Sequence, residues 1–410
     1  MAQLQRKSAS SPPGVVWRQR DGKVSSTASG KAIWLAGLEA MGKINGYSDS
    51  AARIAAAIET ERDWRHNYVT HLSELSALAA SGTEAALAQA EASLAAFHDT
   101  MSFCRDGKSE SILEATADDS LRRSLLAGST VETIEIIGQG SSNHEISVPI
   151  DTSAGADIKT LSGEKLVAQL QAWVDYGAAE PSTVASISSV VSGGASSIKR
   201  KLSSRTFVLL GATSALGPAR PLLSLGATVA AIARPGRKLE ELMSFAESSP
   251  GKLLVPSIKT STPEAGIMNT IGIDLLTQLP EAAEWLLNFP PEETLVIGSY
   301  IYLDGEKHVR AVAAMDALLN VLLSSSSDSE RTIELAYLGS PSTPHLWVPE
   351  AEAAAQLAWS SRSWLVRSAG FKCSLDECGV SSALIKTADM EEKSPRRVYN
   401  GCMVRICYFE

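Results

Sequence analysis

The alternation of strand and helix signals after residue 204 is the feature that most constrains how this chain can fold. Short apolar runs predict strands at residues 207–210, 228–232, 294–297 and 333–337. Between and after them, helical periodicity predicts helices at residues 216–225, 239–246, 280–287, 309–323 and 351–366. A further strand is expected at 253–255 or 271–273, and a last one at 403–408. This pattern is typical of a parallel sheet wrapped by helices, so we predict an α/β fold with a doubly wound sheet over residues 200–410.

The first predicted strand runs into a glycine-containing loop, where a phosphate can approach the backbone. Glycine permits the tight turn, and the following helix offers free N–H groups and the positive end of its dipole. A second strand follows at the spacing of a β-α-β unit, which is the context that such a loop requires. We therefore predict dinucleotide binding by the loop residues Gly211, Thr213, Ser214, Ala215, Leu216 and Gly217. The alternative is a tight strand-to-helix turn without a ligand.

The run Gly-Ala-Thr-Ser-Ala-Leu-Gly at 211–217 resembles the Gly-Ala-Ser-Ser-Gly-Ile-Gly loop of the short-chain dehydrogenase/reductases. The segment 225–229 with Arg234 also resembles the approach to that family's second strand. The resemblance covers about thirty residues, one β-α-β unit, and departs at Ala215, where the family has its middle glycine. It implies a Rossmann-like fold and an NAD(P) cofactor. It also implies that Asp274 meets the adenine edge.

The residues after the second predicted strand bear on the choice of cofactor. An acid at this point would accept hydrogen bonds from the adenosine ribose and repel a 2′-phosphate. This chain instead has three cations, Arg234, Arg237 and Lys238. They favour NADPH over NADH, and the alternative is a solvated charge run that opens a helix.

Ligands of open α/β sheets bind at the carboxyl ends of the strands, so the reacting groups are expected in the loops that follow residues 297 and 337. The family's usual device is a tyrosine with a lysine four residues later, which lowers the phenol pKa. The relevant region has no such pair. We expect Tyr302, or else Tyr300, to replace it, and the two share a face if the strand continues that far. The other candidates are Lys307, His308 and Ser340 for catalysis, and Gly298 and Ser299 for the cofactor.

Two functions remain open on these residues. The first is an NADPH-dependent oxidoreductase, an atypical member of that superfamily, acting on a carbonyl or alkene of a small organic substrate. The second is a non-catalytic NAD(P)-binding scaffold or redox sensor. The missing tyrosine–lysine pair favours the second, whereas the polar, tyrosine-containing loop favours the first. We take the first as the main hypothesis.

The N-terminal half predicts a different organisation. Apolar spacing predicts a mostly helical region over residues 30–190, with three helices in 30–103 and a helix at 162–176. Alternation at 131–136 and 146–150 predicts a β-hairpin through the turn 138–143. The Ser- and Gly-rich stretch 181–197 is either a linker or a loosely ordered helix. Residues 1–29 are expected to form a flexible arm. Its basic, Ser-rich composition indicates either a disordered arm of a cytoplasmic protein or an organelle-targeting peptide.

Composition limits the kinds of partner that this chain is expected to bind. A net charge of −9 argues against nucleic acid, and no apolar run approaches the roughly 20 residues of a membrane helix. The odd count of five cysteines fits a reducing compartment without disulfides. Residues five apart in a strand point to opposite faces of the sheet. We therefore expect no metal site at the pairs Cys373 with Cys378 and Cys402 with Cys407, which have this spacing. A small-molecule substrate and a homo-oligomer are the expected partners.

Overall fold

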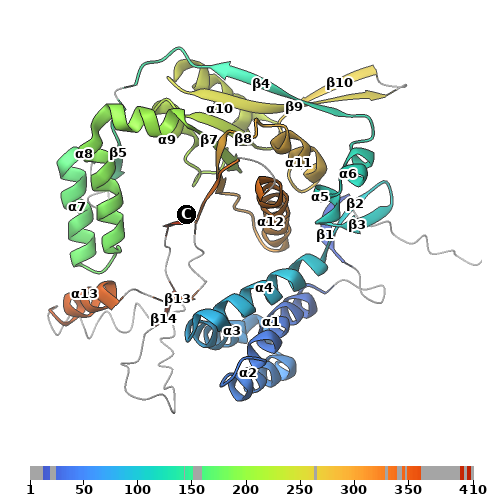
Figure 1. Cartoon of the computed structure of the whole chain (residues 1–410), viewed down its shortest axis with the longest axis vertical. Coiled ribbons are helices and arrows are strands. Elements are labelled where there is room, and N and C mark those ends of the chain that lie inside the picture. The colour runs from blue at the N-terminus through green and yellow to red at the C-terminus, as the bar shows by residue number, and fades with distance from the viewer. Residues whose placement is uncertain are drawn as a thin grey trace, which may run out of the picture.

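The structure is a computed structural model that describes residues 13–18, 25–142, 144–150, 159–262, 266–327, 331–338, 344–346, 349–361, 398–400 and 404–407. It is a mixed α/β protein with a mostly parallel central sheet (Figure 1). Five neighbouring strands run parallel, in the order β9 (Lys252–Thr262), β8 (Thr228–Ile232), β7 (Arg205–Leu210), β11 (Thr294–Ser299) and β12 (Ile333–Leu338). The predicted alternation is thus confirmed, and the third strand begins at the earlier of its two candidate positions.

Both faces of the parallel strands are buried by helices. Helices α9 (Ala219–Ser224) and α10 (Arg237–Ser248) share a buried cluster with Leu209, whereas α11 (Leu279–Leu287) and α12 (Glu306–Ser327) share one with Val208 and Leu210. Successive strand residues point to opposite faces, so a strand covered on both sides must be apolar throughout. This explains the continuous apolar runs in the sequence.

Antiparallel strands extend the sheet beyond its parallel part. Strand β10 (Gly266–Ile271) forms a hairpin with β9, β15 (Val404–Cys407) pairs with β12, and β4 (Thr130–Ile137) pairs with β9 over its full length. The predicted hairpin between 131–136 and 146–150 is therefore wrong. Strand β5 (Ser147–Ile150) pairs with β6 (Lys159–Ser162) instead.

The glycines after β4 have a different purpose from the predicted turn. A Cβ on Gly138 would lie 1.9 Å from the Ser249 carbonyl oxygen, and one on Gly140 would lie 2.5 Å from that of Ser248. The Gly138 N–H donates to the Gly251 carbonyl, and the Gly140 N–H donates to that of Ser249, both at 2.9 Å. These glycines allow the chain to lie directly against the connection between α10 and β9.

The N-terminal region adds four helices where three were predicted: α1 (Ser26–Gly42), α2 (Ser48–Thr60), α3 (Trp64–Ala80) and α4 (Thr83–Asp99). Extended backbone at Glu61 separates α2 from α3, and extended Gly82 precedes α4. A small sheet of β1 (Gly14–Trp17), β2 (Met101–Arg105) and β3 (Lys108–Ser111) follows, with the short helices α5 (Glu114–Ala117) and α6 (Asp119–Leu126).

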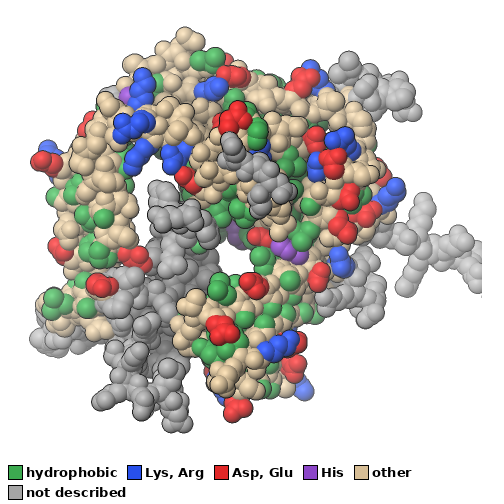
Figure 2. Space-filling view, viewed as in Figure 1, with side chains coloured by type: hydrophobic (Ala, Val, Ile, Leu, Met, Phe, Trp, Pro, Cys, Tyr) green, Lys and Arg blue, Asp and Glu red, His purple; other side chains and the backbone are tan. Residues whose placement is uncertain are grey.

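The remaining elements include a pair of packed helices, α7 (Gly163–Asp175) and α8 (Pro181–Ser203), seen together in Figure 1. Helix α7 was predicted, and α8 resolves the linker question in favour of a helix with non-helical backbone at Gly194. Figure 2 shows Lys and Arg side chains gathered over α8 and α9, where Arg200 and Lys201 complement the dipole of the last turn of α8. Later elements are β13 (Pro344–Leu346), α13 (Pro349–Ser360) and β14 (Val398–Asn400).

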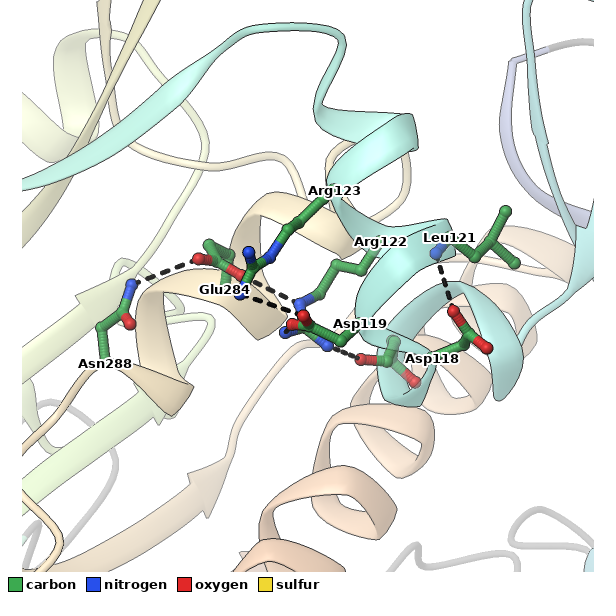
Figure 3. A network of polar contacts seen from close by, with 8 residues as sticks. Asp118, Asp119, Leu121, Arg122, Arg123, Glu284 and Asn288 are labelled. Atoms are coloured by element: carbon green, nitrogen blue, oxygen red, sulfur yellow. Dashed lines mark hydrogen bonds and ion pairs between the residues drawn. The ribbon is translucent and has the colours of Figure 1, made fainter.

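Ion pairs of Arg122 with Glu284 and of Arg105 with Glu281 attach the N-terminal region to α11, and Figure 3 shows the first of them. The Arg122 guanidinium, 6% exposed, donates to Glu284 at 2.9 Å and to Asp119 at 2.6 Å. Arg105 donates to both carboxylate oxygens of Glu281, at 2.8 and 3.1 Å. Removing one partner of such a pair leaves an uncompensated charge, so these contacts specify how the two regions dock.

Helix α12 is the one described helix with the length and apolar composition of a membrane-crossing segment, over Glu306–Ser326. Its residues Ala313, Ala314 and Leu318 are completely buried in the cluster on the α11 side of the sheet. The apolar composition of this helix thus matches its packing in the core.

Candidate functional site

A cavity of about 450 Å³ opens at the carboxyl ends of β7, β8 and β11, a size typical of small-molecule and cofactor sites. It brings together ten residues that the sequence indicated: Gly211, Thr213, Ser214, Ala215, Leu216, Arg234, Lys238, Asp274, Tyr302 and Lys307. The other lining residues are apolar: Ile232, Ala233, Ile273, Leu275, Leu276, Ile301, Leu303 and Ala311.

Gly211 shapes the loop at the centre of this cavity. Its φ of +88° lies in the left-handed region that favours glycine, and its N–H donates to the Ile232 carbonyl at 2.9 Å. A Cβ on Gly211 would lie 2.7 Å from Cγ1 of Ile301 and 2.9 Å from its backbone nitrogen. The loop after β7 therefore packs directly against the chain that leaves β11.

The segment after Gly211 makes two successive turns before the next helix. The Ser214 N–H donates to the Gly211 carbonyl at 2.8 Å, and the Gly217 N–H donates to that of Ser214 at 3.0 Å. Helix α9 begins at Ala219, three residues later than predicted, and spans only six residues. Residues 216–218 therefore belong to the loop and not to the helix.

Besides Arg237, three predicted cofactor residues lie outside the cavity wall: Gly217, Gly298 and Ser299. At Gly217 an added Cβ would lie 3.3 Å from its nearest atom, the Ser214 carbonyl oxygen, which is a tight contact within the loop itself. Gly298 makes room for an aromatic ring, since a Cβ there would lie 2.4 Å from Cε2 of Tyr300. Ser299 is the last residue of β11. These residues support the site without lining it.

Positive charge dominates the end of β8. Arg234 and Lys238 line the cavity, are exposed, and make no ion pair within the described part of the chain. Arg237 points elsewhere: its side chain is 86% exposed and lies 3.4 Å from the Glu241 carboxylate. Two of the three predicted cations therefore face the cavity.

Asp274 is the one carboxylate among the lining residues. It follows the β9–β10 hairpin, and the N–H of its neighbour Ile273 donates to the Ala233 carbonyl at 2.8 Å, which holds this turn beside β8. Its Oδ1 accepts the Leu276 N–H at 3.0 Å. One oxygen of the Asp274 carboxylate is thus occupied by a hydrogen bond within its own turn. Arg234 and Lys238, in contrast, make no ion pair among the described residues.

The β11 end of the cavity carries the candidate proton donor. The Tyr302 side chain lines the wall and is 70% exposed, and its ring centroid lies 5.7 Å from that of His308. Lys307 lines the same wall. His308 does not, and its buried Nδ1 has no hydrogen-bond partner among the described residues.

Tyr300 and Tyr302 do not share a wall, contrary to the expectation from strand alternation. Strand β11 ends at Ser299, and Tyr300 packs with the buried cluster that contains Leu209 and Leu223. Burial raises the pKa of the Tyr300 phenol above its ordinary value. Tyr300 is therefore a packing residue, and Tyr302 is the one of the two that lines the cavity.

Some site residues were missed by sequence reasoning, and some predictions cannot be placed. The spacing of Lys307 and Ala311 on one helical face could have indicated Ala311. No local pattern indicates Leu276, whose carbonyl accepts the Val15 N–H of β1 at 2.7 Å. Ser340, Cys373, Cys378 and Cys402 lie outside the described residues.

Comparisons of the chain with protein-family models, with curated proteins and with solved structures give no match. Function must therefore be argued from the cavity and its residues.

Proposed function

We propose that this chain is an NADPH-dependent oxidoreductase whose sheet is a doubly wound, Rossmann-like sheet. One observation carries the proposal. The glycine loop after β7 and the cations Arg234 and Lys238 after β8 line the same cavity. In a dinucleotide-binding sheet these two places hold the pyrophosphate and the adenosine ribose.

The strand order supports this choice of ligand. Counting only the parallel strands in chain order, the sheet reads 3-2-1-4-5, and the order reverses between β7 and β11. Dinucleotides bind in the crevice at such a switch point, outside the carboxyl ends of the strands. The cavity lies at this point.

The lining residues fit the charges of NADPH. Gly211 allows the loop to turn without a side chain, and Thr213 and Ser214 offer hydroxyls to phosphate oxygens. Arg234 and Lys238 are placed to bind the 2′-phosphate that distinguishes NADPH from NADH. The fit is best for a ligand with several negative charges at the β8 end.

The chemistry follows from the residues at the other end. Bound NADPH would supply a hydride to the carbon of a substrate C=O or C=C bond. The oxygen or second carbon would gain the electron pair of that bond, and the Tyr302 phenol would donate its proton there. Because Tyr302 is 70% exposed, water can return that proton after each turnover. Lys307 places a positive charge on the same wall, where it stabilises the developing phenolate.

Calorimetry with NADPH and NADH tests the cofactor assignment. Arg234→Asp and Lys238→Glu should each weaken NADPH binding by roughly 10- to 100-fold and affect NADH much less, because each loses a charge-assisted contact. Arg237→Asp is the matched control, since Arg237 lies outside the cavity wall and should change little. Equal losses for both cofactors would contradict the placement of the 2′-phosphate.

Turnover of a carbonyl panel tests the catalytic assignment. Tyr302→Phe should lower kcat by roughly 10²- to 10⁴-fold with NADPH affinity intact, as expected for loss of a general acid. Tyr300→Phe is the control, because that ring belongs to the core. A wild-type protein that binds NADPH and reduces nothing would favour the second candidate, a non-catalytic NAD(P)-binding scaffold or redox sensor, to which the absence of a Tyr-x-x-x-Lys pair points.

A further inference from the structure

The two ends of the cavity differ in chemistry. Arg234 follows β8 and Lys238 lies on α10, whereas the lining residues after β11 are Ile301, Tyr302 and Leu303 on the loop and Lys307 and Ala311 on α12. Of these lining residues after β11, Tyr302 and Lys307 have polar side chains, and Ile301, Leu303 and Ala311 are apolar. A molecule bound beside them would meet hydrocarbon from these three residues.

Two large side chains at the cavity are left open to solvent. Leu216, from the loop after β7, is 60% exposed, and Tyr302, after the neighbouring strand β11, is 70% exposed. Both line the same cavity. A ligand lying against both of them would bury their apolar surface, which favours an apolar group over a hydrated one.

Formal charges on the segment that follows β11 sum to zero, although Lys307 is the one among them that lines the cavity. Asp304 and Glu306 precede Lys307, and Arg310 lies 3.6 Å from the Glu306 carboxylate. Two acids and two bases thus lie within seven residues. A substrate carboxylate or phosphate would compete with the developing phenolate for the Lys307 charge, and its remaining oxygens would be desolvated against Leu303 and Ile301.

We propose that the substrate is an uncharged, apolar carbonyl compound, such as an aryl or medium-chain alkyl ketone or aldehyde, with its single oxygen facing Tyr302. This inference rests on the proposed oxidoreductase function. A sugar or an oxo-acid would leave hydroxyl or carboxylate groups without partners against the apolar wall, and each such group costs binding free energy.

The test compares two apolar carbonyl compounds with two polar ones at saturating NADPH. Acetophenone and octanal represent the proposed class, and dihydroxyacetone and pyruvate represent the excluded ones. We expect kcat/KM to favour the first two by at least about tenfold, and Leu216→Ser to reduce that preference by roughly tenfold, because the variant removes buried apolar area. The matched control is Leu87→Ser, a change at a leucine of α4 that is 58% exposed and outside the cavity wall, which should leave the preference unchanged.

A binding measurement separates recognition from turnover. Saturation-transfer NMR should detect the alcohol product of acetophenone on the wild-type protein and on the Leu87→Ser variant, and detect it more weakly on the Leu216→Ser variant. Equal or better kcat/KM for pyruvate or dihydroxyacetone would overturn the substrate class, as would an unchanged preference in Leu216→Ser. If NADPH binding by the wild-type protein is intact in calorimetry, either result leaves the proposed cofactor function standing. Absence of NADPH binding would overturn both proposals.

Discussion

Replacing Gly211 by alanine tests the geometry on which the cavity depends. Gly211 has a φ of +88°, and its missing side chain faces the chain just after β11. An added Cβ would lie 2.7 Å from Cγ1 of Ile301, 2.9 Å from its nitrogen and 3.0 Å from its Cα. Two of these three atoms belong to the backbone, so a side-chain rotation cannot relieve the overlap.

The expected cost has two sources. A non-glycine residue in the left-handed region costs roughly 1–2 kcal/mol, and overpacking of a close contact typically costs about 1–3 kcal/mol. Gly211→Ala should therefore lower the free energy of unfolding by roughly 2–5 kcal/mol. Because Ile301 lines the cavity, the shift should also weaken NADPH binding.

Denaturant unfolding measures the stability change, provided that wild type and variant have the same m-value. Hydrogen exchange in β7 and β11 shows where in the fold the change occurs. Gly217→Ala is the matched control in the same loop. Its φ is not positive and its nearest new contact would be 3.3 Å away, so its cost should stay below about 1 kcal/mol. Equal losses at the two glycines, or a Gly211→Ala variant as stable as the wild type, would refute the reasoning.

Three further predictions concern the rest of the fold. Arg105→Ala should destabilise the docking of the N-terminal region by about 3–5 kcal/mol, because it leaves the buried Glu281 carboxylate unpaired, and Arg105→Ala and Glu281→Gln should not be additive in a double-mutant cycle. Gly138→Ala should speed hydrogen exchange in β4, since its Cβ would lie 1.9 Å from a carbonyl oxygen; unchanged exchange would contradict that contact. Burial raises the pKa of Tyr300 above 10.0, so the stability it contributes is complete below the unfolded pKa and is lost as pH rises through the folded one. Unfolding measured from neutral to alkaline pH should therefore show a smaller loss for Tyr300→Phe than for the wild type, and identical curves would count against the burial.

The positions of the parallel strands along the chain could be predicted because each strand is marked by its own short stretch of sequence. A strand covered on both faces must be apolar at consecutive positions, as in β7 and β8, and helical periodicity marks the segments between them. The loop at Gly211 and the cations Arg234 and Lys238 were predicted for the same reason. Each directly follows a strand, so chain continuity alone brings it to the carboxyl edge of the sheet.

The predictions that were wrong depend on contacts between distant parts of the chain. Strand β4 has the alternation of a hairpin strand, yet its partner β9 lies more than a hundred residues later. Alternation shows which face is buried and does not identify the neighbouring strand. Gly138 and Gly140 likewise suggest a turn, although their role is to let one backbone approach another.

The sequence by itself determined the parallel sheet, the glycine loop and the basic end of β8, because local burial and chain continuity specify them. Only the tertiary structure decided the rest of the cavity. It placed Tyr302 on the wall and Tyr300 in the core, since β11 ends at Ser299 and strand alternation stops there. It also brought Asp274 and Leu276 to the site through the β9–β10 hairpin and the pairing with Val15. Side-chain direction at a strand end and contacts across long loops depend on packing that no short stretch of sequence encodes.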